Sequence, residues 1–307
     1  MNLKHNNLKI NVRAKTFNFA SLFFKKSIRE DIKVLYSFCR YIDDLGDDSS
    51  IKKTHAIKQL NVIKKSITSN KSNDPIIKKF QILMRKYHIS LNAPLFLISA
   101  IKEDLEEIDF KNYSQLINYS FKVAGTVGLM MCKIMKTNSP KLNLRGIQLG
   151  IAMQMTNICR DIKEDLERGR IYIPKTHRTV VNKGCKEILH NKVLRKKMSK
   201  DIEKLIDNSN KIYSNAWNGI LDLPLKFSIP IAISCELYKE IGEKIKKDSC
   251  QIWERRVYVN LFEKIVISFK TFFKVILKYK TRNFSNEEKK ISLILNKLEK
   301  SVYEKKK

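Results

Sequence analysis

Two pairs of aspartates, each pair spaced four residues apart, are the residues of this sequence best suited to chemistry. Asp43 and Asp47 form the first pair, and Asp161 and Asp165 form the second. Residues four apart lie on one face of a helix, so each pair directs two carboxylates to one point. Bare carboxylates repel each other, and a divalent cation removes that repulsion. The spacing therefore predicts that these aspartates bind Mg²⁺, or Mn²⁺ in its place, together with a diphosphate.

The first pair has neighbours that suit an anionic ligand. Arg40 lies one turn before Asp43, and Tyr36 lies one turn before Arg40. A guanidinium, a phenol and two carboxylates on one helical stripe can hold metal and phosphate together. The alternative is a solvated acidic helix end. We expect Asp44 and Asp48 to point away from this stripe and either to support its residues from behind or to be exposed.

The second pair ends a helix that is too apolar to be a solvated face. Gln154 and Asn157 precede Asp161 and Asp165 on the same stripe. Polar groups buried in such a helix need partners, and metal and phosphate oxygens would supply them.

Further groups that could bind diphosphate oxygens follow this stripe. They are Arg160, Arg168, Arg170 and Tyr172. A solvated helix end is the alternative for Arg168 and Arg170. Neither acidic cluster holds cysteine or histidine in a zinc-like arrangement, and no glycine-rich nucleotide motif is present.

The bulk composition indicates one globular domain over residues 1–307. Of the 307 residues 43% are hydrophobic and 30% charged, and no low-complexity linker divides the chain. The six cysteines show no Cys-x-x-Cys spacing, which is typical of reduced thiols in the cytosol. Neither a signal peptide nor a run long enough to span a membrane is evident. We expect a cytoplasmic monomer.

Basic residues outnumber acidic ones by 61 to 31, which gives a net charge of +30. Lys, Asn and Ile abound together, so the bias of an AT-rich genome is the first explanation. Peripheral contact with an anionic membrane, at its inner face, is the second. We expect no nucleic acid partner, because the lysines are scattered and no recognition motif is present.

Apolar residues recur at three- and four-residue spacing along the chain, which predicts an all-α bundle. Gly125 and Gly128 interrupt one apolar segment and indicate a kink or a close helix contact. Proline and asparagine separate several segments, as at residues 73–75. The expected helical segments are 27–45, 52–69, 75–87, 94–107, 113–136, 142–168, 185–222, 226–247 and 255–280.

The segment 261–279 is amphipathic. Lys270, Lys274 and Lys278 are spaced four apart, with phenylalanines between them. We favour a peripheral helix packed on the core; the alternative is a helix on a membrane surface with its lysines towards the headgroups.

Five stretches together resemble the squalene/phytoene synthase family, the head-to-head isoprenyl diphosphate synthases. The resemblance covers about residues 16–256 and leaves 257–307 as basic amphipathic C-terminal helices. It implies a single prenyltransferase domain, an isoprenoid-synthase helical bundle around a central apolar cavity. The stretches are LYSFCRYIDDLGD, YSFKVAGTVGLMM, QMTNICRDIKEDLERGRIYIP, AWNGILDLPLKFSIPIAI and WERRVYV.

The resemblance also implies roles for individual residues. Those matching the metal ligands of the family are Asp43, Asp47, Asn157, Asp161 and Asp165. We expect the catalytic residues to be Arg40, Asp43, Asp47, Asp161, Asp165 and Tyr172. We expect the substrate to contact Arg13, Ala14, Lys15, Thr16, Tyr36, Arg40, Gln154, Arg160 and Arg170.

Three positions depart from the family pattern. Thr16 stands where the family usually has serine, and Lys25 stands at a usual proline position. Cys250 stands where many relatives have tyrosine, which puts a phenol contact there in doubt.

Two stretches, VAGTVGLMM and WERRVYV, are most similar to bacterial phytoene synthases. They imply that two geranylgeranyl diphosphates condense through a cyclopropyl diphosphate to phytoene, an early step of carotenoid biosynthesis. A squalene-type synthase that forms presqualene diphosphate from farnesyl diphosphate is the alternative. A more distant one is a non-catalytic assembly-factor relative, a group that tends to lose the acidic residues present here.

Overall fold

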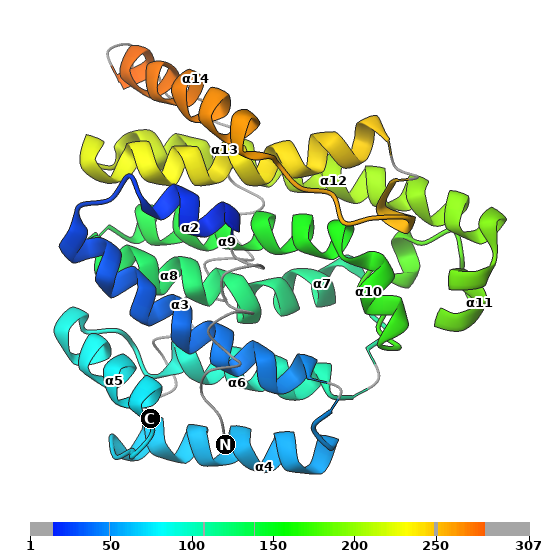
Figure 1. The fold of residues 1–307 in the computed structure, drawn as a ribbon, viewed down its shortest axis with the longest axis horizontal. Coiled ribbons are helices and arrows are strands. Elements are labelled where there is room, and N and C mark those ends of the chain that lie inside the picture. Colours follow the sequence, from blue (N-terminus) through cyan, green and yellow to red (C-terminus); the bar gives the residue numbers. More distant parts are fainter. Residues whose placement is uncertain (1–14, 49, 107, 138, 249–250, 280–307) are drawn as a thin grey trace.

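The computed structural model describes residues 15–279 apart from 49, 107, 138 and 249–250 (Figure 1). In this part of the chain the regular structure is helical, so the all-α prediction is confirmed. A single β-bridge there, between Asp109 and Ile171, belongs to no strand. The helices are α2 (Lys15–Ser21), α3 (Lys26–Asp47), α4 (Lys53–Ser69), α5 (Pro75–Tyr87), α6 (Asn92–Asp104), α7 (Tyr113–Ser120), η1 (Phe121–Gly125), α8 (Thr126–Ile134), α9 (Pro140–Arg160), α10 (Ile162–Glu167), η2 (Lys175–His177), α11 (Cys185–His190), α12 (Lys192–Asp222), α13 (Leu225–Lys247), η3 (Gln251–Trp253) and α14 (Leu261–Tyr279).

Side chains of aspartate and asparagine begin several of these helices. The Asp74 carboxylate accepts hydrogen bonds from the backbone N–H groups of Ile76 and Ile77, at 2.8 and 3.1 Å, where α5 starts. Asn112 and Asn191 cap α7 and α12 in the same way. Such caps satisfy N–H groups that a helix leaves unpaired. The polar breaker at the start of α5 is therefore a helix start, as the sequence predicts.

Two hydrophobic clusters hold the helices together. One is built largely from α9, α12 and α13, and the other from α3, α4, α5, α6 and α8. On α3, Ile32, Phe38 and Ile42 are fully buried at helical spacing. Burying one such side chain contributes about 1.5–3 kcal/mol. Figure 1 shows the result as stacked helices, with α14 at one end of the molecule and α4 at the other.

Glycines allow α9 to approach α8 and the preceding element η1 closely. A Cβ atom on Gly128 would lie 2.1 Å from the carbonyl oxygen of Gly146, and one on Gly150 would lie 2.2 Å from that of Ala124. The turn before α8, which ends at Gly125, is the π-helix η1, an element that often marks a local distortion. The prediction that Gly125 and Gly128 mark a kink or a close contact is therefore confirmed.

Four predicted helical segments are divided or limited differently in the structure, and one of them, 113–136, comprises α7, η1 and α8. The segment 142–168 divides at Asp161 into α9 and α10, and 185–222 divides at Asn191 into α11 and α12. The segment 255–280 becomes helical only at the start of α14. A break of one residue hardly disturbs apolar spacing, so periodicity alone does not reveal it.

The helix α14 packs on α13, as the interpretation that we favoured from the sequence predicts. Unlike an ordinary packing helix, it leaves several phenylalanines exposed, among them Phe262 and Phe269. Within residues that the structure describes, no helix combines the length and the apolar character needed to cross a bilayer.

Candidate active site

A cavity of about 380 Å³ lies between the two hydrophobic clusters. Figure 1 shows α3 and α9 running in the same general direction, so that their C-terminal ends lie on one side of the molecule. Along both helices the lining of the cavity changes from apolar to charged. Leu35 and Cys39 precede Asp43 on α3, and Leu149 precedes Asp161 on α9. The cavity therefore has an apolar part and a charged end.

The first acidic pair lies at the C-terminal end of α3, where Asp43 and Asp47 both line the cavity. This end of a helix carries partial negative charge, so carboxylates there need compensating cations. Arg170 donates a hydrogen bond to Asp47, with Nη1 and Oδ1 3.1 Å apart. Arg168 lies 3.5 Å from the other oxygen of the same carboxylate. Two guanidiniums thus offset the charge of Asp47.

Arg170 also joins the two acidic segments. Its Nη2 donates to the carbonyl oxygen of Gly46 at 2.7 Å and so caps the end of α3. The residue itself follows α10, and it is 7% exposed. The solvated-helix-end alternative is therefore wrong for Arg170. Its contact with diphosphate stays a prediction, as does that of Arg168.

The second acidic pair spans the junction between α9 and α10. Asp161 lies at this junction with φ −101° and ψ 13°. Helical hydrogen bonds nevertheless continue through it: the Asp161 N–H donates to the Asn157 carbonyl, and the Asp165 N–H donates to the Asp161 carbonyl, each at 2.9 Å. Asn157, Asp161 and Asp165 therefore remain on one side of the chain, as their spacing predicts.

Two arginines hold the Asp161 carboxylate. Arg160 donates from Nε and Nη2 to its two oxygens at 2.8 and 2.6 Å. Arg256 donates from Nη2 to Asp161 at 3.1 Å and from Nη1 to Glu164 at 3.3 Å. Both arginines line the cavity. They bring two guanidiniums, the groups best suited to bidentate recognition of phosphate, to its charged end.

Arg40 hydrogen-bonds the Asp44 carboxylate, one turn further along α3. The Asp44 side chain is partly exposed and holds the Arg40 guanidinium in the cavity wall. Asp44 thus positions a site residue, which is one of the two roles expected for it from the sequence. Asp48 is exposed and accepts hydrogen bonds from the backbone and hydroxyl of Ser50.

Asp43 and Asp165 accept no side-chain hydrogen bond within the described part of the chain. Burial raises the pKa of Asp43 to about 7; Arg40 opposes this effect and the neighbouring Asp47 carboxylate adds to it. Burial, reinforced by Asp161, raises the pKa of Asp165 well above its usual range. An added positive charge at this end of the cavity would favour the ionised form of both groups.

A third buried carboxylate, Asp104 at the end of α6, lies in the cavity wall between two tyrosines. The Tyr172 hydroxyl donates to its Oδ1 at 2.8 Å, and the Tyr119 hydroxyl donates to its Oδ2 at 2.9 Å. The two rings stack with centroids 5.0 Å apart. Burial raises the pKa of Asp104 to about 6, although the nearby Arg170 lowers it.

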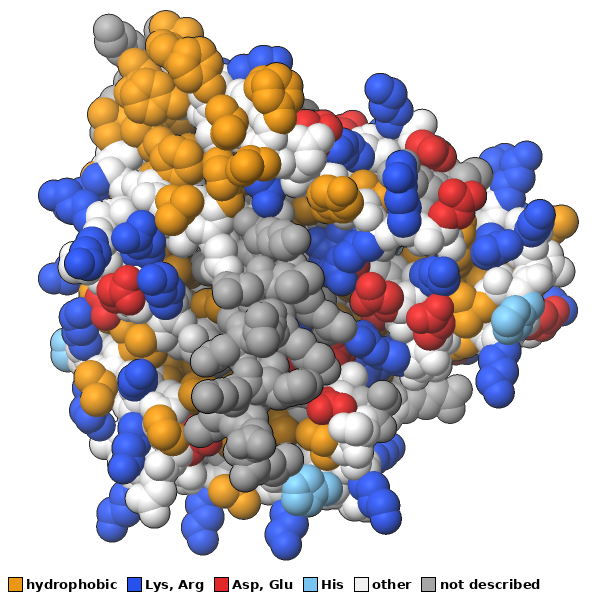
Figure 2. Space-filling model, viewed as in Figure 1, with side chains coloured by type: hydrophobic (Ala, Val, Ile, Leu, Met, Phe, Trp, Pro, Cys, Tyr) orange, Lys and Arg blue, Asp and Glu red, His pale blue; other side chains and the backbone are white. Residues whose placement is uncertain are grey.

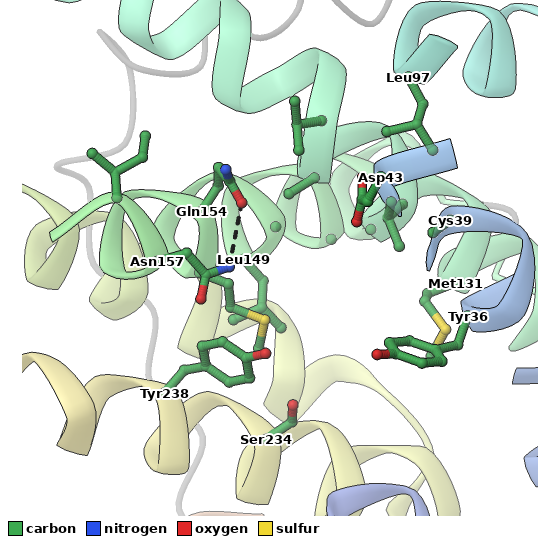
Figure 3. Close-up of a pocket in the computed structure, with 18 of the residues that line it drawn as sticks. Tyr36, Cys39, Asp43, Leu97, Met131, Leu149, Gln154, Asn157, Ser234 and Tyr238 are labelled. Carbon is green, nitrogen blue, oxygen red and sulfur yellow. Dashed lines mark hydrogen bonds between the residues drawn. The ribbon is translucent and has the colours of Figure 1, made fainter. Parts of the chain in front are cut away.

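Side chains from α3, α6, α8, α9 and α13 surround the middle of the cavity (Figure 3). Tyr36 from α3 and Tyr238 from α13 point their hydroxyl groups towards one another across it. Burial raises the pKa of Tyr36 to about 12, so its phenol stays protonated near neutrality. The Asn157 amide nitrogen donates to the Gln154 oxygen at 3.3 Å, and this leaves the buried Asn157 Oδ1 without a hydrogen-bond partner.

The donor atoms of the site fit Mg²⁺. They are carboxylate and amide oxygens, the ligands that hard cations prefer, and the free Asn157 Oδ1 is one of them. In the described part of the chain, no three acidic, histidine or cysteine side chains stand close enough to enclose an ion by themselves. Mg²⁺ commonly takes one or two carboxylates and completes its coordination with water and phosphate oxygens. Paired aspartates are therefore compatible with an ion that also binds a diphosphate.

The predicted N-terminal contacts are only partly visible. Thr16 lines the cavity from α2. Arg13 and Ala14 lie outside the described residues, as does the side chain of Lys15. Cys250, the position of the expected tyrosine, also lies outside them.

Several lining residues were not singled out from the sequence. Asp104 sits in a charged helix end that looks solvated, and nothing local indicates that it turns inward. Tyr238 follows an apolar run and has Glu236 and Lys239 beside it, but no acidic pair at four-residue spacing marks it as a site residue. Tyr119 and Arg256 do lie in stretches that resemble the family, and these stretches could have indicated them.

Comparisons with known proteins agree with this geometry. The sequence profile of the family described as "Squalene/phytoene synthase" matches residues 10–263. A 15-cis-phytoene synthase of Enterobacter agglomerans is 29% identical over 267 residues, which cover 83% of this chain and 90% of the relative. A 15-cis-phytoene synthase of Pantoea ananas is 27% identical over 269 residues, covering 83% and 86%.

Solved structures share the fold. A dehydrosqualene synthase in complex with a ligand superimposes with a TM-score of 0.73 at 22% identity, covering 88% of this chain and 94% of that one. A squalene synthase from Alicyclobacillus acidocaldarius gives a TM-score of 0.66 at 20% identity, covering 77% and 90%. The profile match over residues 10–263 shows that the chain belongs to the squalene/phytoene synthase family.

Proposed function

We propose that this prenyltransferase joins two geranylgeranyl diphosphates head to head in a Mg²⁺-dependent reaction that gives phytoene. Membership of the family makes the chain a prenyltransferase. The specific reaction is supported by relatives named phytoene synthase, which match more than four fifths of the chain. Phytoene formation would place the enzyme early in carotenoid biosynthesis.

The main observation behind the proposal is that the cavity has a charged end and an apolar part. Its charged end holds the two aspartate pairs with Arg160, Arg168, Arg170 and Arg256. Its apolar part is lined by side chains such as Leu97, Met131, Leu149, Ile220 and Ile231. A prenyl diphosphate has the same division, with a charged head and a long apolar tail.

The residues of the charged end would bind and activate the diphosphate. Asp43, Asp47, Asn157, Asp161 and Asp165 would hold Mg²⁺, which when bound would stabilise the charge on the departing diphosphate. The arginines that pair with Asp47 and Asp161 already line this end of the cavity, where they would bind the diphosphate oxygens. Guanidiniums placed in advance stabilise a leaving group without reorganising solvent.

The apolar walls would protect the carbocation that the departing diphosphate leaves behind. Water would quench such a cation, and the buried side chains exclude it. Tyr119 and Tyr172 both donate their hydroxyl protons to Asp104. On the side that faces the cavity, each hydroxyl oxygen can therefore act only as an acceptor. An oxygen lone pair suits a positively charged intermediate better than an O–H donor would.

The proposal is tested by product analysis. We would incubate the purified protein with geranylgeranyl diphosphate or farnesyl diphosphate in the presence of Mg²⁺ and identify products by mass spectrometry. We expect a product with the mass of phytoene from the longer donor, and none after chelation of the metal. Turnover of farnesyl diphosphate alone would identify the squalene-type alternative. No turnover of either donor would point to a non-catalytic relative.

Matched variants distinguish the loss of a metal ligand from a general effect of removing one negative charge. We expect Asp43→Asn and Asp161→Asn to lower kcat by about a thousandfold or more, because each removes a metal ligand. Asp48→Asn removes the same charge from the same end of α3, but the side chain is exposed. It should keep activity within about twofold of wild type. Circular dichroism checks that all three variants stay helical.

A further inference from the structure

The helix α14 turns its polar side towards the body of the protein. Lys264, Ser268, Thr271 and Val275 are the α14 residues that are buried, and three of these four are polar. Ion pairs add to the contact with α13, such as the one between Lys274 and Glu236, and of the apolar α14 side chains Val275 and the partly buried Ile267 pack on the core. A helix that packs to bury apolar surface would present the opposite face.

The apolar side of α14 is exposed instead. Phe262, Phe269 and Leu277 are 75%, 66% and 65% exposed, and Ile265 and Phe273 are about half exposed. Figure 2 shows hydrophobic side chains gathered over this helix at the top of the view. Scattered exposed apolar residues are ordinary, but a continuous patch of large ones marks a surface that binds something.

The patch continues onto the end of α2. Leu22 and Phe23, which follow this helix, are 59% and 43% exposed. The Phe23 ring packs on that of Phe19, with centroids 5.8 Å apart. The ammonium group of Lys264 on α14 lies 5.8 Å from the centre of the Phe19 ring. We call this combined surface the α14 patch: Leu22, Phe23, Phe262, Ile265, Phe269, Phe273 and Leu277.

Exposed lysines border the α14 patch. Lys25 and Lys26 follow Phe23 after one intervening residue, and on α14 Lys270 is next to Phe269 and Lys278 is next to Leu277. The nearby acidic residue Glu263 is already paired with a lysine of α13, at 2.7 Å. Apolar side chains bordered by lysines fit the boundary between the headgroups and acyl chains of an anionic bilayer.

We infer that the α14 patch binds the surface of an anionic lipid membrane. Charge complementarity decides between the available occupants. A second copy of this chain would bring lysines against lysines, in a protein of net charge +30. Residues 280–307 are also net basic. An anionic lipid surface is the occupant for which both the apolar and the basic parts of the patch are favourable.

The patch is connected to the cavity through α2. Thr16 near the start of this helix lines the cavity, whereas Leu22 and Phe23 beyond its end belong to the patch. If the proposed function is correct, a membrane at the patch would bring lipid-soluble substrate and product within one short helix of the site. Membrane binding itself does not depend on which reaction the enzyme performs.

Vesicle sedimentation of the full-length protein tests the inference. We would compare vesicles of phosphatidylcholine with vesicles that also contain phosphatidylglycerol. We expect binding to the anionic vesicles that weakens with salt. The triple variant Phe262→Ser, Phe269→Ser and Phe273→Ser should lower the partition coefficient by about tenfold or more, because it removes large apolar groups from the patch. These side chains are exposed, so the fold should be retained.

A matched control replaces exposed apolar residues elsewhere. Val62→Ser, Ile82→Ser and Val193→Ser lie on α4, α5 and α12, where the side chains are 59%, 56% and 63% exposed. This variant should bind vesicles as the wild type does. Equal loss in both triple variants, or no binding of anionic vesicles by the wild type, would overturn the inference. A dimer that forms without lipid and dissociates only in the phenylalanine variant would also overturn the inference, because the patch would then join two copies of the chain.

Charge variants test the basic border in the same assay. Lys25→Gln, Lys26→Gln, Lys270→Gln and Lys278→Gln together should abolish the preference for anionic vesicles. A control variant removes the same charge from exposed positions on α4 and α5: Lys64→Gln, Lys65→Gln, Lys78→Gln and Lys79→Gln. This control should retain the preference for anionic vesicles. Activity on detergent-solubilised substrate should survive in every variant, so failure of membrane binding is distinguishable from failure of the proposed reaction.

Discussion

The carboxyl group of Asp104 links the fold to the chemistry of the site. It is 6% exposed and accepts hydrogen bonds from two tyrosines that line the cavity. Burial raises its pKa to about 6, from an ordinary value of 3.8. The folded protein therefore binds this proton more tightly than the unfolded chain does. Its contribution to stability is greatest below pH 4 and is lost as the pH rises through 6.

Because the pKa of Asp104 is raised in the folded protein, the variant Asp104→Asn should differ from the wild type in how its stability depends on pH. Between pH 7 and pH 4, the free energy of unfolding of the wild type should rise relative to that of the variant by roughly 3 kcal/mol, as a shift of about two pKa units implies. Urea denaturation at several pH values measures this difference. The control Val62→Ser, at an exposed position without an ionisable group, should show no such trend. A difference between Asp104→Asn and wild type that is constant with pH would contradict the raised pKa.

Asp104 also shows where inference from the sequence stops. The aspartate pairs could be found because four-residue spacing fixes their common face, and the hydrogen bonds through Asp161 preserve that face. No spacing rule relates Asp104 to Tyr119 and Tyr172, which reach it from other segments. The same holds for the contact of Arg170 with Gly46, which depends on how α3 and the segment after α10 meet.

The contact between α8 and α9 fixes one wall of the cavity. Gly128 and Gly150 stand where any side chain would strike the backbone of the opposite helix. The sequence indicated a close approach at Gly125 and Gly128, because glycine is unexpected in an apolar helix. It did not indicate that Gly146 and Gly150 would be the partners, since pairing of distant helices leaves no local pattern.

Gly150→Ala should destabilise the protein. Its Cβ would lie 2.2 Å from the Ala124 carbonyl oxygen, and backbone cannot move aside as a flexible side chain can. We expect a net loss of about 2 kcal/mol, because overpacking outweighs the ~1 kcal/mol that alanine gains over glycine in a helix. Urea denaturation measures the loss.

The control for this variant is Gly184→Ala, where an added Cβ meets nothing within 4 Å. It should change the free energy of unfolding by less than about 1 kcal/mol. A loss for Gly150→Ala no larger than that for Gly184→Ala would show that the contact between η1 and α9 tolerates a side chain.

Across the molecule, helical periodicity was sufficient to predict an all-α bundle and most helix limits. Periodicity could not show which side of α14 faces the protein, because an amphipathic helix can bury either face, depending on its partner. The polar side of α14, with Lys264 and Ser268, is the buried one. The position of the cavity likewise depends on how α3 and α9 are arranged, which is a property of the assembled bundle.

The arrangement of α3 and α9 places two carboxylate pairs at one end of one cavity, and the proposed reaction depends on both pairs sharing metal ions with a diphosphate. Crystals grown with Mn²⁺ and an unreactive thiolodiphosphate analogue of the prenyl donor would test this directly by anomalous diffraction. We predict Mn²⁺ peaks at about 2.2 Å from oxygens of Asp43 or Asp47 and from oxygens of Asn157, Asp161 or Asp165, with the diphosphate between them. Metal peaks at only one pair, or a diphosphate bound away from both, would contradict it.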